Sequence, residues 1–183
     1  MKPVEVHQNF LDPALIKEIK EYSDKQVGEF TWRSSYAWPQ LVQRFTPPVL
    51  ALELTPFHKS IQDQYRKLSK SWKNIEIHTP LFYAWPQGSY IAWHSDQEYE
   101  FASIIYLNQQ WDMDYGGIFL YYENKKIRGL SPHYNQCVLS AQGVPHAVSR
   151  TTIDAPVRQT IQIFGKKKKT TSFYADGGRK KIK

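Results

Sequence analysis

Two residues with metal-binding side chains, His94 and Asp96, stand one residue apart in the segment Trp-His-Ser-Asp. Side chains at positions i and i+2 of an extended strand project from the same face, so the imidazole and the carboxylate are expected to converge. One further histidine would complete a face of two imidazoles and one carboxylate, the arrangement typical of non-haem Fe(II) oxygenases. The alternative interpretation of the pair is a surface turn with a solvated aspartate.

The third ligand is expected from a later strand, and two histidines are candidates. His146 stands in Gly-Val-Pro-His-Ala-Val, a turn that leads into a strand, fifty residues after Asp96. That separation allows several strands to return the chain to the same place. His133 follows a proline and precedes another strand, and we interpret it as a surface or core histidine. The remaining histidines precede the pair, in or beside helical or early-strand segments: His7, His58 and His78.

A second pair, Arg158 and Thr160, also occupies one face of a predicted strand. A planar guanidinium with a neighbouring hydroxyl is suited to hold a carboxylate by two hydrogen bonds. An arginine that points into the protein without an anion would be costly to bury. The alternative is an outward-pointing Arg158 that pairs with a surface acid.

The elements that position these residues can be read from periodicity and turn signals. Asp12-Pro13 is typical of a helix start, and an apolar stripe predicts a helix over 13–22; a second start at Thr55-Pro56 predicts a helix over 55–72. The rest of the chain reads as short strands separated by turns, which favours a sandwich or barrel such as a jelly roll. We predict these strands at 75–78, 81–83, 90–94, 102–108, 118–122, 127–130, 136–140, 146–149 and 157–164.

Composition and charge limit the classes of protein to which the chain can belong. The 183 residues suit a single domain, the lone cysteine Cys137 suits a reducing cytoplasm, and no secretion signal or membrane span is expected. Residues 166–183 hold eight basic residues and one acidic residue, which leaves sixteen of each sign in the body. A neutral body argues against a nucleic-acid groove in the fold, although a flexible basic tail is suited to a weak contact with a polyanion.

Together, His94, Asp96, His146, Arg158 and Thr160 resemble the 2-oxoglutarate- and Fe(II)-dependent oxygenases, in particular the branch similar to prolyl 4-hydroxylases. The resemblance covers roughly residues 75–165 and includes Gly-Ser-Tyr before the metal motif, Ile-Tyr-Leu-Asn at 105–108 and Pro-His-Ala-Val at 145–148. It implies a mainly β domain over residues 1–165: a double-stranded β-helix (jelly roll) at about 75–165, buttressed by N-terminal helices within about 1–74.

The resemblance also implies a role for each site residue. His94, Asp96 and His146 would bind iron, and Arg158, assisted by Thr160, would grip the distal carboxylate of 2-oxoglutarate. Tyr83 is the candidate for a further contact with that co-substrate, and Trp93 for shaping the substrate cleft. With O2, these cofactors would support hydroxylation of a C–H bond, and the loop 97–101 and the segment 31–46 would act as lids that exclude water.

Several functions remain open at this stage. The resemblance favours a hydroxylase of a peptide or protein, with proline as the first target; the alternatives are a hydroxylase of a free amino acid or small metabolite and a metal-free jelly-roll binding module. Nucleic-acid demethylases usually place a second arginine six residues after the co-substrate arginine, where this chain has Phe164. The oligomeric state does not follow from the sequence.

Overall fold

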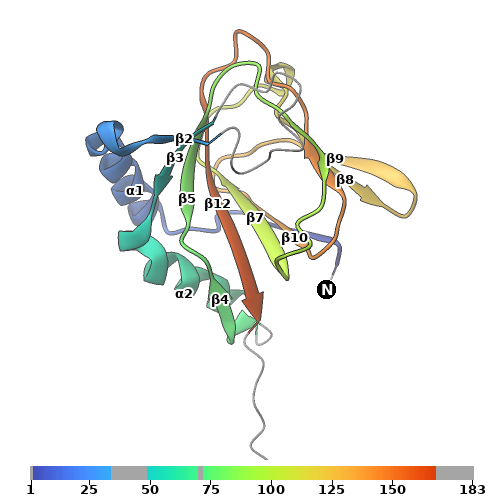
Figure 1. Cartoon of the computed structure of the whole chain (residues 1–183), viewed down its shortest axis with the longest axis horizontal. Coiled ribbons are helices and arrows are strands. Elements are labelled where there is room, and N and C mark those ends of the chain that lie inside the picture. The colour runs from blue at the N-terminus through green and yellow to red at the C-terminus, as the bar shows by residue number, and fades with distance from the viewer. Residues whose placement is uncertain (1, 34–48, 70–71, 168–183) are drawn as a thin grey trace, which may run out of the picture.

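Two antiparallel sheets form the framework of the protein (Figure 1). The computed structural model describes residues 2–33, 49–69 and 72–167. The larger sheet has the strand order β1-β10-β7-β12-β5-β3-β2, with β4 added alongside the end of β12. Its strands are β1 (Val4–His7), β2 (Thr31–Arg33), β3 (Val49–Glu53), β4 (Ile75–Ile77), β5 (Leu81–Trp85), β7 (Phe101–Tyr106), β10 (Cys137–Ala141) and β12 (Arg158–Lys167).

The smaller sheet has the strand order β6-β11-β8-β9 and faces the larger one. Its strands are β6 (Ile91–His94), β8 (Phe119–Glu123), β9 (Lys126–Leu130) and β11 (His146–Val148). Apolar side chains from both sheets meet between them, including Ile104, Val138, Phe119 and Val148. The small sheet therefore closes one face of the large sheet over a shared core.

Two helices cover the other face of the large sheet, on the left of Figure 1. Helix α1 (Pro13–Lys25) begins at Asp12, whose carboxylate accepts a hydrogen bond from the backbone amide of Ala14. Helix α2 (His58–Leu68) buries Ile61 and Tyr65. Short 3-10 turns occur at Val27–Glu29, Thr55–Phe57 and Met113–Tyr115.

Alternation along the central strands divides their side chains between these two layers. On β12, Ile161 and Ile163 pack with the helices, whereas Arg158 and Thr160 occupy the opposite face, toward the small sheet. On β7, Ile105 packs with the helices and Tyr106 packs between the sheets. The long strand β12 thus supplies both the main core and the candidate co-substrate residues.

The expected fold class, a mainly β jelly roll supported by N-terminal helices, is confirmed. The N-terminal part also contributes three strands, β1, β2 and β3, which extend the large sheet. Helix α2 ends at Leu68, before the expected end at residue 72, and β12 continues to Lys167 because its last residues pair with β4. Most of the segment 31–46 and the tail beyond Lys167 lie outside the described residues.

No helix in the described part of the chain has both the length and the apolar character needed to cross a bilayer.

Candidate metal centre

His94, Asp96 and His146 come together at the end of β6 and the start of β11. Each offers one ligand atom, and the three atoms lie within 4.8 Å of one another. The Nε2 atom of His94 lies 3.8 Å from the Asp96 carboxylate, and the Nε2 atom of His146 lies 3.4 Å from it. The expected grouping of these residues is therefore present, and it is the one such group that the described residues form.

The backbone orients both imidazoles toward the carboxylate. The Nδ1 atom of His94 lies 2.9 Å from the carbonyl oxygen of Ala92, and that of His146 lies 2.9 Å from the carbonyl oxygen of Val144. A carbonyl only accepts hydrogen bonds, so each neutral ring carries its proton on Nδ1 and keeps the lone pair of Nε2 free for a metal. Such outer hydrogen bonds are a common feature of metal-binding histidines.

An irregularity in β6 aims His94 inward. Strand register pairs His146 with His94 and Val148 with Ile91, so two steps along β11 correspond to three along β6. One extra residue on β6 is the signature of a β-bulge, which redirects side chains near functional sites. Both Ile91 and His94 consequently face the space between the sheets, and Asp96 follows just beyond the end of the strand.

The surroundings of His94 disfavour its protonation. Burial lowers the pKa of His94, and the neighbouring His146 lowers it further. The ring of Phe119 stacks on His146, with centroids 5.3 Å apart and planes inclined by 24°. A neutral imidazole is the form that binds a metal.

Arg158 lies at the start of β12 and is 2% exposed. Its Nη1 donates to the carbonyl oxygen of Gly117 at 3.1 Å, and its guanidinium lies 4.9 Å from the centroid of the Trp85 ring. No carboxylate pairs with it among the described residues, and burial lowers its pKa to about 10. The outward orientation considered from the sequence is therefore wrong, since the side chain is buried.

A row of hydroxyl-bearing side chains lies beside Arg158. Thr160 is directly opposite Tyr83 on β5 and Tyr106 on β7, so all three project from the inner face of the large sheet. The Thr160 hydroxyl accepts a hydrogen bond from Trp85 Nε1 at 3.0 Å. The Tyr83 ring packs edge-on against Trp85, with centroids 5.4 Å apart.

Tyr106 is a functional candidate that the sequence reasoning missed. Among the described residues, its buried hydroxyl and the buried Nε of Arg158 both lack a hydrogen-bond partner. Burial raises the pKa of Tyr106 to about 12, so its hydroxyl keeps its proton and remains a donor. The available signal was a single hydroxyl within the apolar run Ile104 to Leu107.

The other candidate residues occupy different surroundings. Trp93 is 44% exposed on β6, next to His94. His133 is exposed on the turn before β10 and is not part of the ligand group. The loop after Asp96 contacts the rest of the protein: the Tyr99 ring packs against Phe164 with centroids 4.5 Å apart, and Gln142 Nε2 donates to the carbonyl of Gln97 at 2.7 Å.

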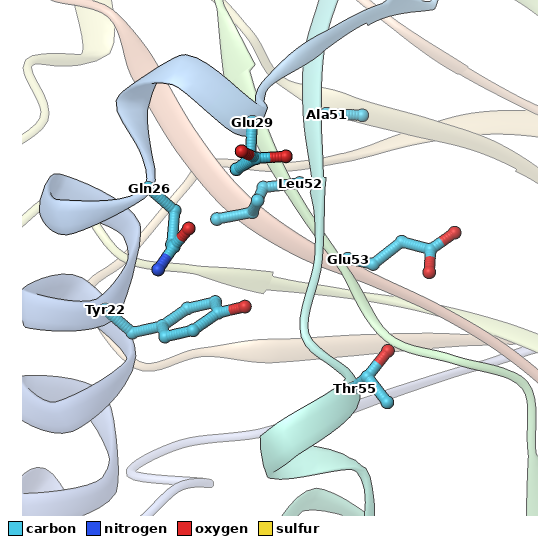
Figure 2. Close-up of a pocket in the computed structure, with 7 residues that line it drawn as sticks. All are labelled: Tyr22, Gln26, Glu29, Ala51, Leu52, Glu53 and Thr55. Carbon is cyan, nitrogen blue, oxygen red and sulfur yellow. The ribbon is translucent and has the colours of Figure 1, made fainter.

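A pocket of about 480 Å³ lies elsewhere, between the end of α1 and β3 (Figure 2). Its polar lining includes Tyr22, Gln26, Glu29 and Glu53. The side chains of Glu29 and Glu53 extend to opposite sides of β3, so their carboxylates do not converge on one point. We therefore do not treat this pocket as a metal site.

Comparison with known proteins finds similar structures but no similar sequence family. The sequence matches no family model, and no curated protein matches it either. The structure is similar to a prolyl-4-hydroxylase from Pseudomonas putida, with a TM-score of 0.69 over 91% of this chain and 94% of that one, at 13% identity. The chain shares the fold of prolyl hydroxylases.

Two further structures with the prolyl hydroxylase fold were solved with ligands. One, from Trichoplax adhaerens, is in complex with a peptide fragment of the hypoxia inducible factor oxygen degradation domain; it matches with a TM-score of 0.71 and 17% identity, over 90% of this chain and 84% of that one. The other is a viral collagen prolyl hydroxylase from Paramecium bursaria Chlorella virus-1 in its 2-oxoglutarate complex, with a TM-score of 0.63 and 11% identity, over 90% of this chain and 96% of that one. The resemblance noted in the sequence is thus confirmed at the level of the fold.

Proposed function

We propose that this protein is a 2-oxoglutarate- and Fe(II)-dependent dioxygenase that hydroxylates a C–H bond of a peptide or protein, with peptidyl proline as the first candidate. The observation that carries the proposal is the combination of two groups between the sheets. The small sheet presents His94, Asp96 and His146, and the large sheet presents a buried Arg158 that no carboxylate in the described chain neutralises.

The ligand group fits an Fe(II) ion. Two imidazoles and one carboxylate on one face leave further coordination positions for a co-substrate and O2, which is the donor set of non-haem Fe(II) oxygenases. The Nδ1–H donors of His94 and His146 are held by backbone carbonyls, so both Nε2 atoms are ready to bind without reorganisation. Asp96 completes the set from the end of β6.

The second group fits the distal carboxylate of 2-oxoglutarate. A buried guanidinium is strongly unfavourable without an anion, and the lowered pKa of Arg158 reports that unbalanced burial. A bound carboxylate would offset it and would accept hydrogen bonds from Arg158 Nε and the Tyr106 hydroxyl, both of which lack partners in the described structure. Trp85 and Thr160, joined by a hydrogen bond, lie beside this position. Tyr83 lies opposite Thr160 on β5 and is our further candidate for a contact with the co-substrate.

Bound Fe(II), 2-oxoglutarate and O2 supply oxidative decarboxylation of the co-substrate coupled to hydroxylation of a substrate C–H bond. The chain positions these groups and keeps water away. Phe119 stacks on His146, and Ile91 and Val148 belong to the same apolar cluster as Phe119. Trp93, which is exposed and adjoins His94 on β6, is our candidate for a contact with the substrate.

The substrate class rests on analogy with similar folds. The similar enzyme from Trichoplax adhaerens is in complex with a peptide fragment, which supports a peptide substrate for this chain. A fold does not determine a substrate, so a hydroxylase of a free amino acid or small metabolite is the competing enzyme function. We further propose that residues 1–165 act as one catalytic domain and that the basic residues from Lys166 onward are not part of its chemistry.

The decisive experiment is succinate release from 2-oxoglutarate in air with added Fe(II), for the wild type, His94→Ala and Arg158→Ala. His133→Ala is the matched control, because His133 is exposed and lies outside the ligand group. Turnover by the wild type and His133→Ala alone would support the proposal. If Fe(II) and Mn(II) also fail to bind in a calorimetric titration, the oxygenase proposal is wrong and the metal-free binding module replaces it.

A further inference from the structure

The row of metal ligands continues across the small sheet to its edge. His94 lies opposite His146, His146 lies opposite Tyr121 on β8, and Tyr121 lies opposite Arg128 on β9. Directly opposed residues project from the same face, so Tyr121 and Arg128 share the face of the metal ligands. Neighbouring strands are about 4.8 Å apart, which places the Arg128 backbone about 10 Å from that of His146.

The β8–β9 hairpin that bears Arg128 projects away from the body of the protein, on the right of Figure 1. Its turn is formed by Asn124 and Lys125, both with positive φ (51° and 62°), as in the tight turns that suit twisted hairpins. Residues 124–129 are all exposed. The hairpin is therefore a projecting arm with an open surface.

The hairpin is basic. Between Glu123 and Arg128 it bears three cations, Lys125, Lys126 and Arg128, and one acid. Arg128 Nε lies 3.9 Å from the Glu123 carboxylate, and the Arg128 side chain is 51% exposed. An exposed pair of this length contributes little to stability and exchanges readily for a better partner. Lys126 lies opposite Glu123, so it shares the face of Arg128.

The loop that follows β6, at the other end of the ligand row from β9, is acidic. The loop that follows β6 contains Asp96, Glu98 and Glu100 and no basic residue. The Tyr99 ring in this loop packs against Phe164, and the Glu100 amide donates a hydrogen bond to the Gly165 carbonyl at 3.0 Å. Acidic residues thus follow the ligands after the end of β6, and basic residues end the row on β9.

We propose that Arg128 and Lys126 bind an acidic side chain of a peptide substrate, about three residues to one side of the residue that reacts. An extended chain advances about 3.3 Å per residue, so three residues span the roughly 10 Å between the metal ligands and Arg128. The acidic loop after β6 disfavours a second acid on the other side of the target. This inference rests on the proposed function, because it takes His94 and His146 to mark the reacting position.

A peptide fits this surface better than a nucleic acid. The basic cluster is small, and a polyphosphate backbone that crossed the mouth would run against the acidic loop at Glu98 and Glu100. A single carboxylate, in contrast, needs only the two cations on the ligand face of β9.

Binding of fluorescein-labelled peptides, measured by anisotropy, tests the proposal with and without Mn(II) and 2-oxoglutarate. The panel is a neutral proline-containing peptide with one Glu placed two, three or four residues before or after the proline, and the same peptides with Gln. We expect at least fivefold tighter binding for Glu than for Gln on one side of the proline. Arg128→Gln should remove this preference. Arg128→Glu should reverse it, so that a further peptide with Lys at the same position binds more tightly than the Glu peptide.

The control variant is Arg66→Gln, since Arg66 is also a partly exposed arginine that pairs with an acid, Asp63, but lies on α2. It should bind the panel as the wild type does. Equal affinity for Glu and Gln peptides, an unchanged preference in Arg128→Gln, or tighter binding of a labelled single-stranded oligonucleotide that Arg128→Gln abolishes would each overturn the proposal. A failed metal titration instead overturns the oxygenase function, so the two results are distinguishable.

Discussion

His94 and His146 lie directly opposite each other across β6 and β11, with ring centroids 4.2 Å apart. Both rings direct Nε2 toward Asp96 because a carbonyl two residues earlier in the chain holds each Nδ1. Strand pairing and two local hydrogen bonds therefore assemble the ligand group. Such preorganisation lowers the reorganisation that binding would require.

Removal of one metal-binding side chain should strongly weaken the affinity for the metal. We expect Asp96→Asn and His146→Ala to weaken Mn(II) affinity by at least about 100-fold, since even outer-shell changes often cost 10–100-fold. Titration calorimetry or electron paramagnetic resonance measures this. The exposed His133→Ala should bind as the wild type does. An Asp96→Asn variant of undiminished affinity would show that the group is not a metal site.

Replacement of Arg158 should raise the stability of the protein without ligand and weaken the binding of 2-oxoglutarate. Arg158→Met removes a buried cation that has no carboxylate partner in the described chain, so we expect the free energy of unfolding without ligand to rise by about 1–3 kcal/mol. The variant should also lose the increase in melting temperature that 2-oxoglutarate gives the wild type. Arg150→Met is the control: Arg150 is exposed and lies over Tyr90. A lower stability and a retained 2-oxoglutarate shift in Arg158→Met would contradict this account.

The Tyr106 hydroxyl should matter for 2-oxoglutarate and not for folding. Tyr106→Phe deletes an atom with no partner in the described structure, so stability should change little. Affinity for 2-oxoglutarate should fall about three- to tenfold, the value of one hydrogen bond of about 0.5–1.5 kcal/mol.

Tyr65→Phe is the contrasting variant. Its hydroxyl bonds to Ser103 in the core, so we expect a loss of about 1 kcal/mol of stability and unchanged 2-oxoglutarate affinity. Denaturant titration and calorimetry give both quantities for each variant. The assignment of Tyr106 is wrong if both variants affect the same quantity.

Two glycines test the space around the candidate carboxylate site. Gly117 and Gly143 have similar positive φ values, 67° and 73°, so alanine should impose a similar backbone strain of about 1 kcal/mol at each. A Cβ at Gly117 would lie 3.0 Å from Arg158 Nη1, whereas nothing lies within 4 Å of one at Gly143. We expect Gly117→Ala, but not Gly143→Ala, to weaken 2-oxoglutarate binding in calorimetry. Equal effects would place Gly117 outside the site.

The protein without metal should lose stability on acidification below about pH 6.5. Burial lowers the pKa of His94, so the unfolded chain, with an ordinary histidine pKa of 6.5, binds more protons there than the native state. Stability contributed by neutral His94 is present above that pH and falls until the pH passes the lowered native pKa. Urea unfolding in chelator between pH 7 and pH 5 measures the slope. His94→Asn should flatten it, and an identical slope in this variant would contradict the assignment.

Periodicity and spacing were sufficient for the local structure. The Asp12 cap, the apolar stripe of α1 and the turn-separated strands are properties of neighbouring residues, and they appear where the pattern placed them. The same is true of the one-residue spacing of Arg158 and Thr160, because alternation on a strand does not depend on the rest of the fold. The strands from residue 75 onward and the residues of the ligand group could therefore be predicted.

Long-range pairing decided the rest. The bulge in β6 that turns both Ile91 and His94 inward depends on the register with β11, more than fifty residues later, and no pattern in β6 alone encodes it. The same pairing brings His146, rather than His133, to Asp96, and the pairing of β12 with β5 and β7 buries Arg158 beside Tyr106. Burial and hydrogen-bond partners are properties of the assembled sheets, so only the tertiary structure could distinguish a buried Arg158 from a surface one.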